Sequence, residues 1–420
     1  MVLTFIIGIY VARYLGPYKL GILSYALSFV ALFKFVTDLG LDRIIVRSLV
    51  TKDDDDRILL GSAFMMKCVG ALILVCLVFF AVSCISVEAE VKWLITIIAA
   101  GMLFDPFLVI VSYFQSKVQI RYVTFSYSIS IIITAALKLI LILMQAELIW
   151  FAIVVVFEQA LLGFILIIFY FKKRFPIFYW KFDSGTAKRL LLSSWPLLLS
   201  SMSIMLYMRI DQVMIKAIIG NEGVGNYAVA VKISELWYFI PIAINQSLFP
   251  ALLVTRAQDP INFKKYLQHL YDLMILAAVI IAIPVSFLSY PLIHILFGSY
   301  YADAAGVLNI HIWSSIFVFV GVATNSLFLA ENLQIFTFYR TFLGCIVNIV
   351  LNFIFIPFAG INGAAMATLI SQSIVGYFSL LLFKKTRYVF WIVTQSLNIF
   401  LLINRLIFIF SKHKVSQYSK

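Results

Sequence analysis

The sequence predicts an all-α polytopic membrane protein with about twelve transmembrane helices in two six-helix bundles. Of the 420 residues, 63% are hydrophobic and only 12% are charged, and the mean hydropathy is +1.05. A soluble domain is roughly half apolar and a quarter charged, so this chain has too many apolar side chains for a soluble interior. Apolar runs such as Leu137 to Met144 lack the alternating polar residues of a membrane β-barrel strand.

Twelve apolar stretches are candidate membrane helices, which typically need about 18 or more mainly apolar residues. They are residues 1–15, 22–39, 58–84, 93–115, 122–144, 149–171, 190–218, 226–250, 266–297, 307–330, 341–358 and 363–383. The first stretch would extend only about 22 Å as a helix, whereas the hydrocarbon core is roughly 30 Å thick. We therefore expect the first helix to be truncated at its N-terminus.

The net charge of +13 is concentrated in alternate loops. The loops 40–57, 116–121, 172–189, 251–265, 331–340 and 384–387 hold 19 Lys and Arg residues. The intervening loops 16–21, 85–92, 145–148, 219–225, 298–306 and 359–362 hold only Lys19 and Lys92. Because basic residues of short loops accumulate on the cytoplasmic side, this alternation supports the number of spans and predicts that both bundle ends are cytoplasmic. It also argues against a role in binding nucleic acid.

The longest polar interruption, residues 172–189, divides the chain into an N-terminal six-helix bundle, 1–180, and a C-terminal six-helix bundle, 181–387. A weak internal repeat agrees with this division. Leu15-Gly16 is followed by Gly21 and a Tyr-Ala pair, and Ile219-Gly220 is followed by Gly225 and another Tyr-Ala pair. Residues 388–420 form an apolar and basic tail with basic residues on both flanks, so we favour an interfacial or partly re-entrant segment over an extra span.

Eight charged residues lie well inside the predicted spans. They are the basic residues Lys67, Lys138, Arg209 and Lys232 and the acidic residues Asp105, Glu158, Asp211 and Glu235. An unpaired charge in a membrane span costs from about 2.5 to more than 10 kcal/mol, so such residues usually face a watery cavity or one another. Either these groups only neutralise one another and fix helix packing, or they line a site for a charged substrate.

Helical spacing restricts how these charges can be used. Lys232 and Glu235 are three residues apart, so they share a helix face and can pair. Asp211 lies about 200° around the helix from Arg209, so only one of them can face a given cavity. For Arg209 and Lys232 we favour the functional reading, since a guanidinium offers a bidentate fork suited to phosphate oxygens.

Several functional classes lack their sequence signals. The chain has no G-x-x-x-x-G-K-[ST] phosphate-binding loop, and its four His and four Cys residues show no metal or redox spacing. No Ser-His-acid or paired-carboxylate arrangement occurs beside an extended soluble loop. We therefore predict no cofactor, no metal and no enzymatic activity.

A set of motifs extends over about residues 9–387. It comprises Val11-Ala-Arg-Tyr-Leu-Gly-Pro17, Asp38-Leu-Gly-Leu-Asp-Arg43, Phe114-Gln-Ser-Lys117 with Arg121-Tyr122, Arg209-Ile-Asp-Gln212, Gly220 to Tyr227, Ile233-Ser-Glu235, Leu296-Phe-Gly298 and Gly360-Ile-Asn-Gly-Ala364 with Ser371-Gln372. As a set they resemble the O-antigen and polysaccharide flippases of the Wzx type, in the multidrug/oligosaccharidyl-lipid/polysaccharide exporter superfamily. No single motif would suffice.

The resemblance implies a two-lobed secondary transporter of the bacterial inner membrane. Its cargo would be an undecaprenyl-pyrophosphate-linked oligosaccharide, such as an O-antigen unit of lipopolysaccharide, moved by alternating access and driven by H⁺ or Na⁺. Its partners would be membrane lipid and the polysaccharide polymerase machinery. Candidates for a cationic lumen are Arg209, Lys232, Lys67 and Lys138, and candidates for ion coupling or charge pairing are Asp211, Glu235, Glu158 and Asp105.

Three alternatives are compatible with the sequence. The same fold could export a peptidoglycan precursor or drugs. An integral-membrane O-antigen polymerase or ligase is the alternative from another class, but the longest loop expected outside the cell, residues 298–306, is short and holds no basic residue. A structural scaffold is the third, and the charges inside the spans argue against it.

Overall fold

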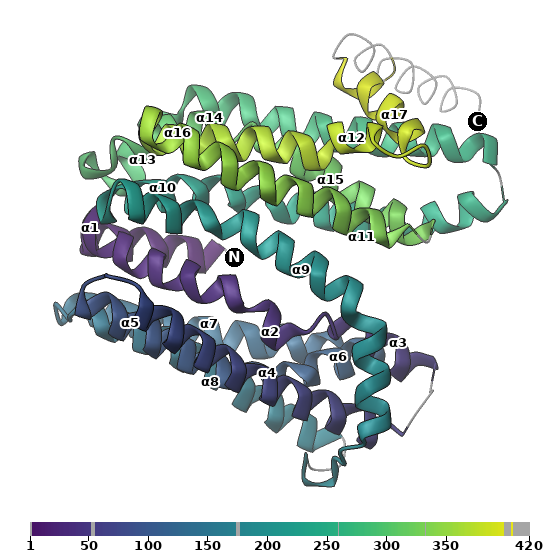
Figure 1. Cartoon of the computed structure of the whole chain (residues 1–420), viewed down its shortest axis with the longest axis horizontal. Helices are drawn as coiled ribbons and strands as arrows, with labels where there is room; N and C mark the ends of the chain where they lie inside the picture. Colours follow the sequence, from purple (N-terminus) through teal and green to yellow (C-terminus); the bar gives the residue numbers. More distant parts are fainter. Residues whose placement is uncertain are drawn as a thin grey trace, which may run out of the picture.

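The computed structural model describes residues 2–51, 55–173, 177–258, 260–331, 333–398 and 405, and this part of the chain is helical and contains no strands (Figure 1). The first half contains α1 (Val2–Phe33), α2 (Phe35–Asp38), α3 (Asp42–Thr51), α4 (Asp56–Cys84), α5 (Ala89–Gly101), the 3-10 helix η1 (Met102–Leu108), α6 (Val109–Ser116), α7 (Ile120–Leu143) and α8 (Leu148–Lys173). The second half contains η2 (Ile177–Tyr179), α9 (Ser184–Ile218), α10 (Asn221–Glu235), η3 (Leu236–Tyr238), α11 (Phe239–Gln258), α12 (Pro260–Phe287), α13 (Ser289–Phe297), η4 (Ser299–Tyr301), α14 (Ala304–His311), α15 (Ser314–Ala330), α16 (Gln334–Gly376), η5 (Phe378–Leu381) and α17 (Arg387–Leu397).

The number of membrane spans follows from two glycine bends. Within the described residues, nine helices are long and apolar enough to cross a membrane, or ten when α14 and α15, which meet at 42°, count as one span. Two of these ten each consist of two helices, joined at Gly16 in α1 (φ 69°) and at Gly360 in α16 (φ 61°). Glycine adopts such positive φ values without steric cost. The predicted fold class, with about twelve spans, is confirmed.

Several predicted spans are interrupted within their bounds, among them 266–297 and 93–115. The apolar stretch 266–297 is divided into α12 and α13, which meet at Leu288. The dipeptide Asp105-Pro106 lies in η1, so the helix around it is locally 3-10 rather than α-helical. Proline lacks the amide hydrogen needed for an α-helical hydrogen bond, which accounts for this break.

Three cores of buried apolar side chains define how the two halves meet. The largest core joins them, with Ile22 and Phe29 of α1, Ile98 of α5, Tyr227 of α10 and Val307 of α14. A second core lies within residues 252–393 of the second half, and a third consists of first-half residues between 41 and 170 together with Leu190 near the start of α9. Figure 1 shows the halves together where α1, α10 and α13 lie and apart where α3, α11 and α17 lie. The halves therefore share a core at one end, which we call the shared end, and have separate cores at the other.

Helix α9 connects the halves. Near the start of α9, the Asp183 backbone carbonyl accepts a hydrogen bond from the Ser62 hydroxyl of α4. Gly40 also packs closely here, because a β-carbon added to it would lie against the backbone of Leu197 and Leu198. Farther along, α9 packs against α16 and α10. The predicted domain boundary at residues 180–181 falls just before this helix and stays a prediction. Of the predicted tail, α17 packs against α12, whereas residues 399–404 and 406–420 lie outside the described part of the chain.

Candidate substrate cavity

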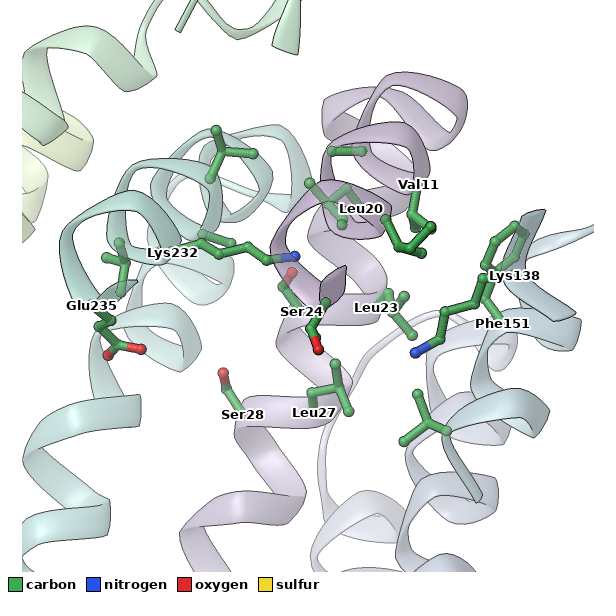
Figure 2. A pocket seen from close by; sticks show the side chains of 18 of the residues that line it. Val11, Leu20, Leu23, Ser24, Leu27, Ser28, Lys138, Phe151, Lys232 and Glu235 are labelled. Atoms are coloured by element: carbon green, nitrogen blue, oxygen red, sulfur yellow. The ribbon is translucent and has the colours of Figure 1, made fainter. Parts of the chain in front are cut away.

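A cavity of about 360 Å³ lies between the two halves. It is lined by α1, α7 and α8 of the first half and by α9, α10 and the end of α13 of the second half. Figure 2 shows Lys232 and Glu235 on one side and Lys138 on the other, with Ser24 and Ser28 of α1 between them. The remaining lining is mostly apolar, which leaves these few polar groups to determine what the cavity binds.

Each half contributes one pair of opposite charges to the cavity. In the first half, the Lys138 Nζ lies 3.0 Å from a Glu158 carboxylate oxygen. In the second half, the Arg209 Nη2 lies 3.6 Å from a Glu235 carboxylate oxygen. All four side chains remain between 20% and 33% exposed, so these pairs are accessible from the cavity.

Lys232 is the third cation of the cavity, and it reaches across the interface between the halves. A β-carbon added to Gly8 of α1 would lie 1.8 Å from the Lys232 Nζ, so the ammonium occupies space that any larger residue at position 8 would fill. Among the described residues Lys232 has no carboxylate within ion-pair distance. The lining of the cavity thus holds three cations and two carboxylates, one net positive charge.

The structure differs from the pairing suggested by helical spacing. Lys232 and Glu235 are close in sequence, but Glu235 pairs with Arg209 of the neighbouring helix. The gap left by Gly8 allows the Lys232 ammonium to extend toward α1 instead. Spacing within a helix identifies possible partners, and contacts with other helices select among them.

Asp211 points away from the cavity, as its 200° separation from Arg209 requires. Its carboxylate is 3% exposed and accepts hydrogen bonds from the Tyr227 hydroxyl at 2.7 Å, the Thr368 hydroxyl at 2.6 Å and the Asn352 side-chain amide at 2.5 Å. These partners come from α10 and from both segments of α16. No basic side chain of the described residues pairs with this carboxylate.

Lys67 and Asp105 also lie outside the cavity. The buried Lys67 Nζ is 2.5 Å from a carboxylate oxygen of Asp42, and Asp105 lies 3.6 Å from the Lys34 Nζ. Lys34 therefore pairs with Asp105 rather than with Asp38, its neighbour four residues along the chain. The cavity brings together five of the eight predicted residues, namely Lys138, Glu158, Arg209, Lys232 and Glu235.

Comparison with known proteins places the chain in a family. The family described as "Polysaccharide biosynthesis protein" matches residues 1–256, which is more than half of the chain. The chain belongs to the polysaccharide biosynthesis protein family. No curated protein sequence matches it.

Solved structures show the same fold as this member of the polysaccharide biosynthesis family. An inward-facing multidrug resistance transporter of the MATE family, in the MOP superfamily, superposes with a TM-score of 0.76 at 13% identity, over 94% of this chain and 95% of that one. The lipid II flippase MurJ, in an inward closed conformation, superposes with a TM-score of 0.71 at 18% identity, over 97% and 92%. An outward-facing MATE transporter gives 0.63 at 14% identity, over 94% and 92%. The similar proteins are transporters and flippases rather than enzymes.

The uncharged polar side chains that line the cavity were not identified from the sequence. They are Thr4, Ser24, Ser28, Thr134 and Gln212. The Ser28 hydroxyl donates a hydrogen bond of 2.9 Å to the Gln212 side-chain oxygen, which links α1 to α9. Gln212 belongs to a motif noted in the sequence, but hydroxyl residues are common in membrane helices and give no signal by themselves. Gly8 was missed because its role lies in the space that it leaves.

Proposed function

We propose that this protein is a flippase that moves an oligosaccharide linked to undecaprenyl pyrophosphate, such as an O-antigen unit, across the bacterial inner membrane. The observation that carries the proposal is the cavity between the halves, where three cations face two carboxylates inside an otherwise apolar bundle. Membership of the polysaccharide biosynthesis family and the likeness of fold to a lipid II flippase support a lipid-linked saccharide as cargo.

A pyrophosphate carries about two or more negative charges, and it cannot enter a low-dielectric interior without compensation. Lys232 supplies one positive charge that no carboxylate of the cavity neutralises. Arg209 and Lys138 supply two more when the pyrophosphate replaces Glu235 and Glu158 as their partner. The planar fork of Arg209 suits two phosphate oxygens at once.

The other parts of the cargo meet different surroundings. The hydroxyls of Ser24, Ser28 and Thr134 and the amide of Gln212 can hydrogen-bond to sugar hydroxyls. The polyprenyl chain stays in the lipid, through a gap between the bundles, because its transfer into a polar cavity would lose apolar contacts. The flipped unit would then pass to the polysaccharide polymerase machinery.

Alternating access fits the arrangement of the three cores. The halves are joined by the shared core at one end and packed separately at the other, so this conformation is the one in which the cavity is closed toward the shared end. The better superposition with an inward-facing than with an outward-facing MATE transporter supports an inward-facing assignment. In this conformation the cavity would load from the cytoplasm.

We further propose that Asp211 is the site of ion coupling. A buried carboxylate without a basic partner is costly unless a proton or a bound cation neutralises it. The Asn352 side-chain oxygen beside it is buried and accepts no hydrogen bond from the described residues, so an acceptor next to the carboxylate is available to a cation. Thr368 supplies a third oxygen.

Substitution of the cavity cations tests the transport function. Lys232→Met and Arg209→Ala should each abolish surface O-antigen in a strain that depends on this protein, while the variants accumulate in the membrane at wild-type levels. Lys67→Met is the matched control, since Lys67 is a buried lysine that pairs with Asp42 outside the cavity. Wild-type surface polymer with both cavity variants would contradict the cationic-cavity proposal.

The alternative cargo is a peptidoglycan precursor. Lipid II shares the prenyl pyrophosphate, so the cavity charges alone do not separate the two substrates. Transport of each lipid in proteoliposomes that contain the purified protein distinguishes them.

A further inference from the structure

The repeated glycine motifs meet at the shared end, and the proposed function does not use them. Gly16 and Gly220 both have positive φ, 69° and 114°, and each precedes a helical segment. Five residues after each of them comes another glycine, Gly21 in α1 and Gly225 in α10. The weak repeat in the sequence therefore corresponds to the same local structure in both halves.

The two motifs contact each other reciprocally through their backbones. A β-carbon on Gly21 would lie 1.8 Å from the Asn221 carbonyl oxygen, and one on Gly225 would lie 2.0 Å from the Pro17 carbonyl oxygen. Asn221 and Pro17 each follow the first glycine of their own motif. The second glycine of each motif thus packs against the start of the other, in a two-fold arrangement between the halves.

Further contacts between the halves surround these glycines. The Tyr301 hydroxyl donates a hydrogen bond of 2.7 Å to the Ala12 carbonyl oxygen, and the Arg13 guanidinium donates to the carbonyls of Leu296 and Ile295. Ala12 also lines the cavity, together with Phe297 of the second half. The glycine contact therefore lies beyond the cavity, on the side where the halves are joined.

We propose that Gly21 and Gly225 form a backbone clasp that closes this end of the cavity and separates when the end opens during transport. Small residues let membrane helices approach closely and gain van der Waals contact. At the two glycines the contact is made with backbone atoms and not with interdigitating side chains, so the helices can part and rejoin at this point without a change of side-chain rotamer. A β-carbon at either position collides with a carbonyl of the other half, so it blocks the closed arrangement and leaves the opposite one accessible.

The clasp is tested by labelling from each side of the membrane, which requires no substrate and so is independent of the proposed function. Ser24→Cys in the cavity serves as the reporter, in a variant whose native cysteines Cys68, Cys76, Cys84 and Cys345 are replaced. Gly21→Ala and Gly225→Ala should each raise, by roughly tenfold, the rate at which a membrane-impermeant maleimide labels the reporter from the side of the shared end, the order expected for one overpacked methyl.

Two glycines provide matched controls. A β-carbon on Gly163 would make ordinary contact with Phe107 at 3.4 Å, and one on Gly321 would meet no atom within 4 Å. Gly163→Ala and Gly321→Ala should leave the labelling rate unchanged. Tyr301→Phe, which removes one hydrogen bond without adding volume, should shift labelling in the same direction as the clasp variants and tests the proposal even if those fail to accumulate. Unchanged labelling in all three test variants, or an equal shift in the glycine controls, would overturn it.

Discussion

The carboxylate of Asp211 lies among neutral hydrogen-bond donors rather than beside a cation, and this makes its charge dependent on what it binds. Its three donors, Tyr227, Asn352 and Thr368, come from two other helices, so any change at the carboxylate is transmitted to α10 and α16. The pairs that line the cavity are different, because each carboxylate there already has a basic partner. The two sets of acids are therefore suited to different roles.

Asp211→Asn should remove the response of the protein to its coupling ion. A ligand that binds only the folded state raises its stability as the ligand concentration rises. If the ion is Na⁺, NaCl should raise the melting temperature of the purified wild-type protein relative to KCl, and Asp211→Asn should abolish the difference. If the ion is H⁺, the variant should instead lose a pH dependence that the wild type shows. Asp303→Asn, which changes an exposed acid, is the control. An Asp211→Asn protein whose melting temperature depends on NaCl and on pH as the wild type's does would contradict the proposal.

Composition and helical spacing predicted which residues carry charge inside the membrane, but not which of them meet. Spacing gives a direction around one helix axis and says nothing about the helix that lies in that direction. Asp211 and Arg209 were correctly expected to diverge, whereas Lys67 could be separated from Lys138 only by their tertiary partners, Asp42 and Glu158.

At the scale of elements, α9 is the helix that connects the two halves along the chain. Its N-terminus is capped by Asp183, whose carboxylate accepts a 2.7 Å hydrogen bond from the Thr186 backbone amide. Hydrogen bonds from the backbone and hydroxyl of Thr186 lower the pKa of Asp183 below its ordinary value of 3.8. The Asp183 backbone carbonyl also accepts a hydrogen bond from the Ser62 hydroxyl of α4, and its backbone amide donates one to the same hydroxyl oxygen, so the cap fixes α9 to the first half.

The lowered pKa of Asp183 predicts the sign of a pH effect. The ionised cap stabilises the folded state fully above the ordinary value of 3.8, and this contribution is lost as the pH falls through the lowered folded-state pKa. Asp183→Asn keeps a good N-cap acceptor but cannot titrate. Melting temperatures measured between pH 7 and pH 3 should therefore decline less steeply for Asp183→Asn than for the wild type. A parallel decline in both proteins would show that this carboxylate does not contribute.

The elements themselves were largely predictable, because apolar length is a strong signal in a membrane protein. Each of α1 and α16 consists of two helices joined at a glycine, Gly16 or Gly360, and glycine is recognisable from the sequence as a turn residue. The division of residues 266–297 into α12 and α13 has no comparable signal, since Leu288 at the junction is an apolar residue in an apolar stretch. Packing against other helices decides such breaks.

For the whole molecule, the position of the shared core determines which side of the membrane the cavity faces. The loops at the shared end, among them 16–21, 219–225 and 298–306, are those with few basic residues. The separate cores lie beside the loops that are rich in Lys and Arg. If basic loops are cytoplasmic, the present conformation is closed toward the outside of the cell.

Labelling of one residue at each end tests this orientation. Phe178, 91% exposed, lies in the strongly basic loop 172–189, and Tyr300, 83% exposed, lies in loop 298–306, which has no basic residue. In cells whose outer membrane has been made permeable and whose inner membrane is intact, a membrane-impermeant maleimide should label Tyr300→Cys. Phe178→Cys should react only after the inner membrane is also made permeable. The reason is that Lys and Arg near span ends are retained on the cytoplasmic side during insertion. The reverse pattern would invert the membrane topology, and this conformation would then be the one that releases cargo at the outer face rather than the one that loads it from the cytoplasm.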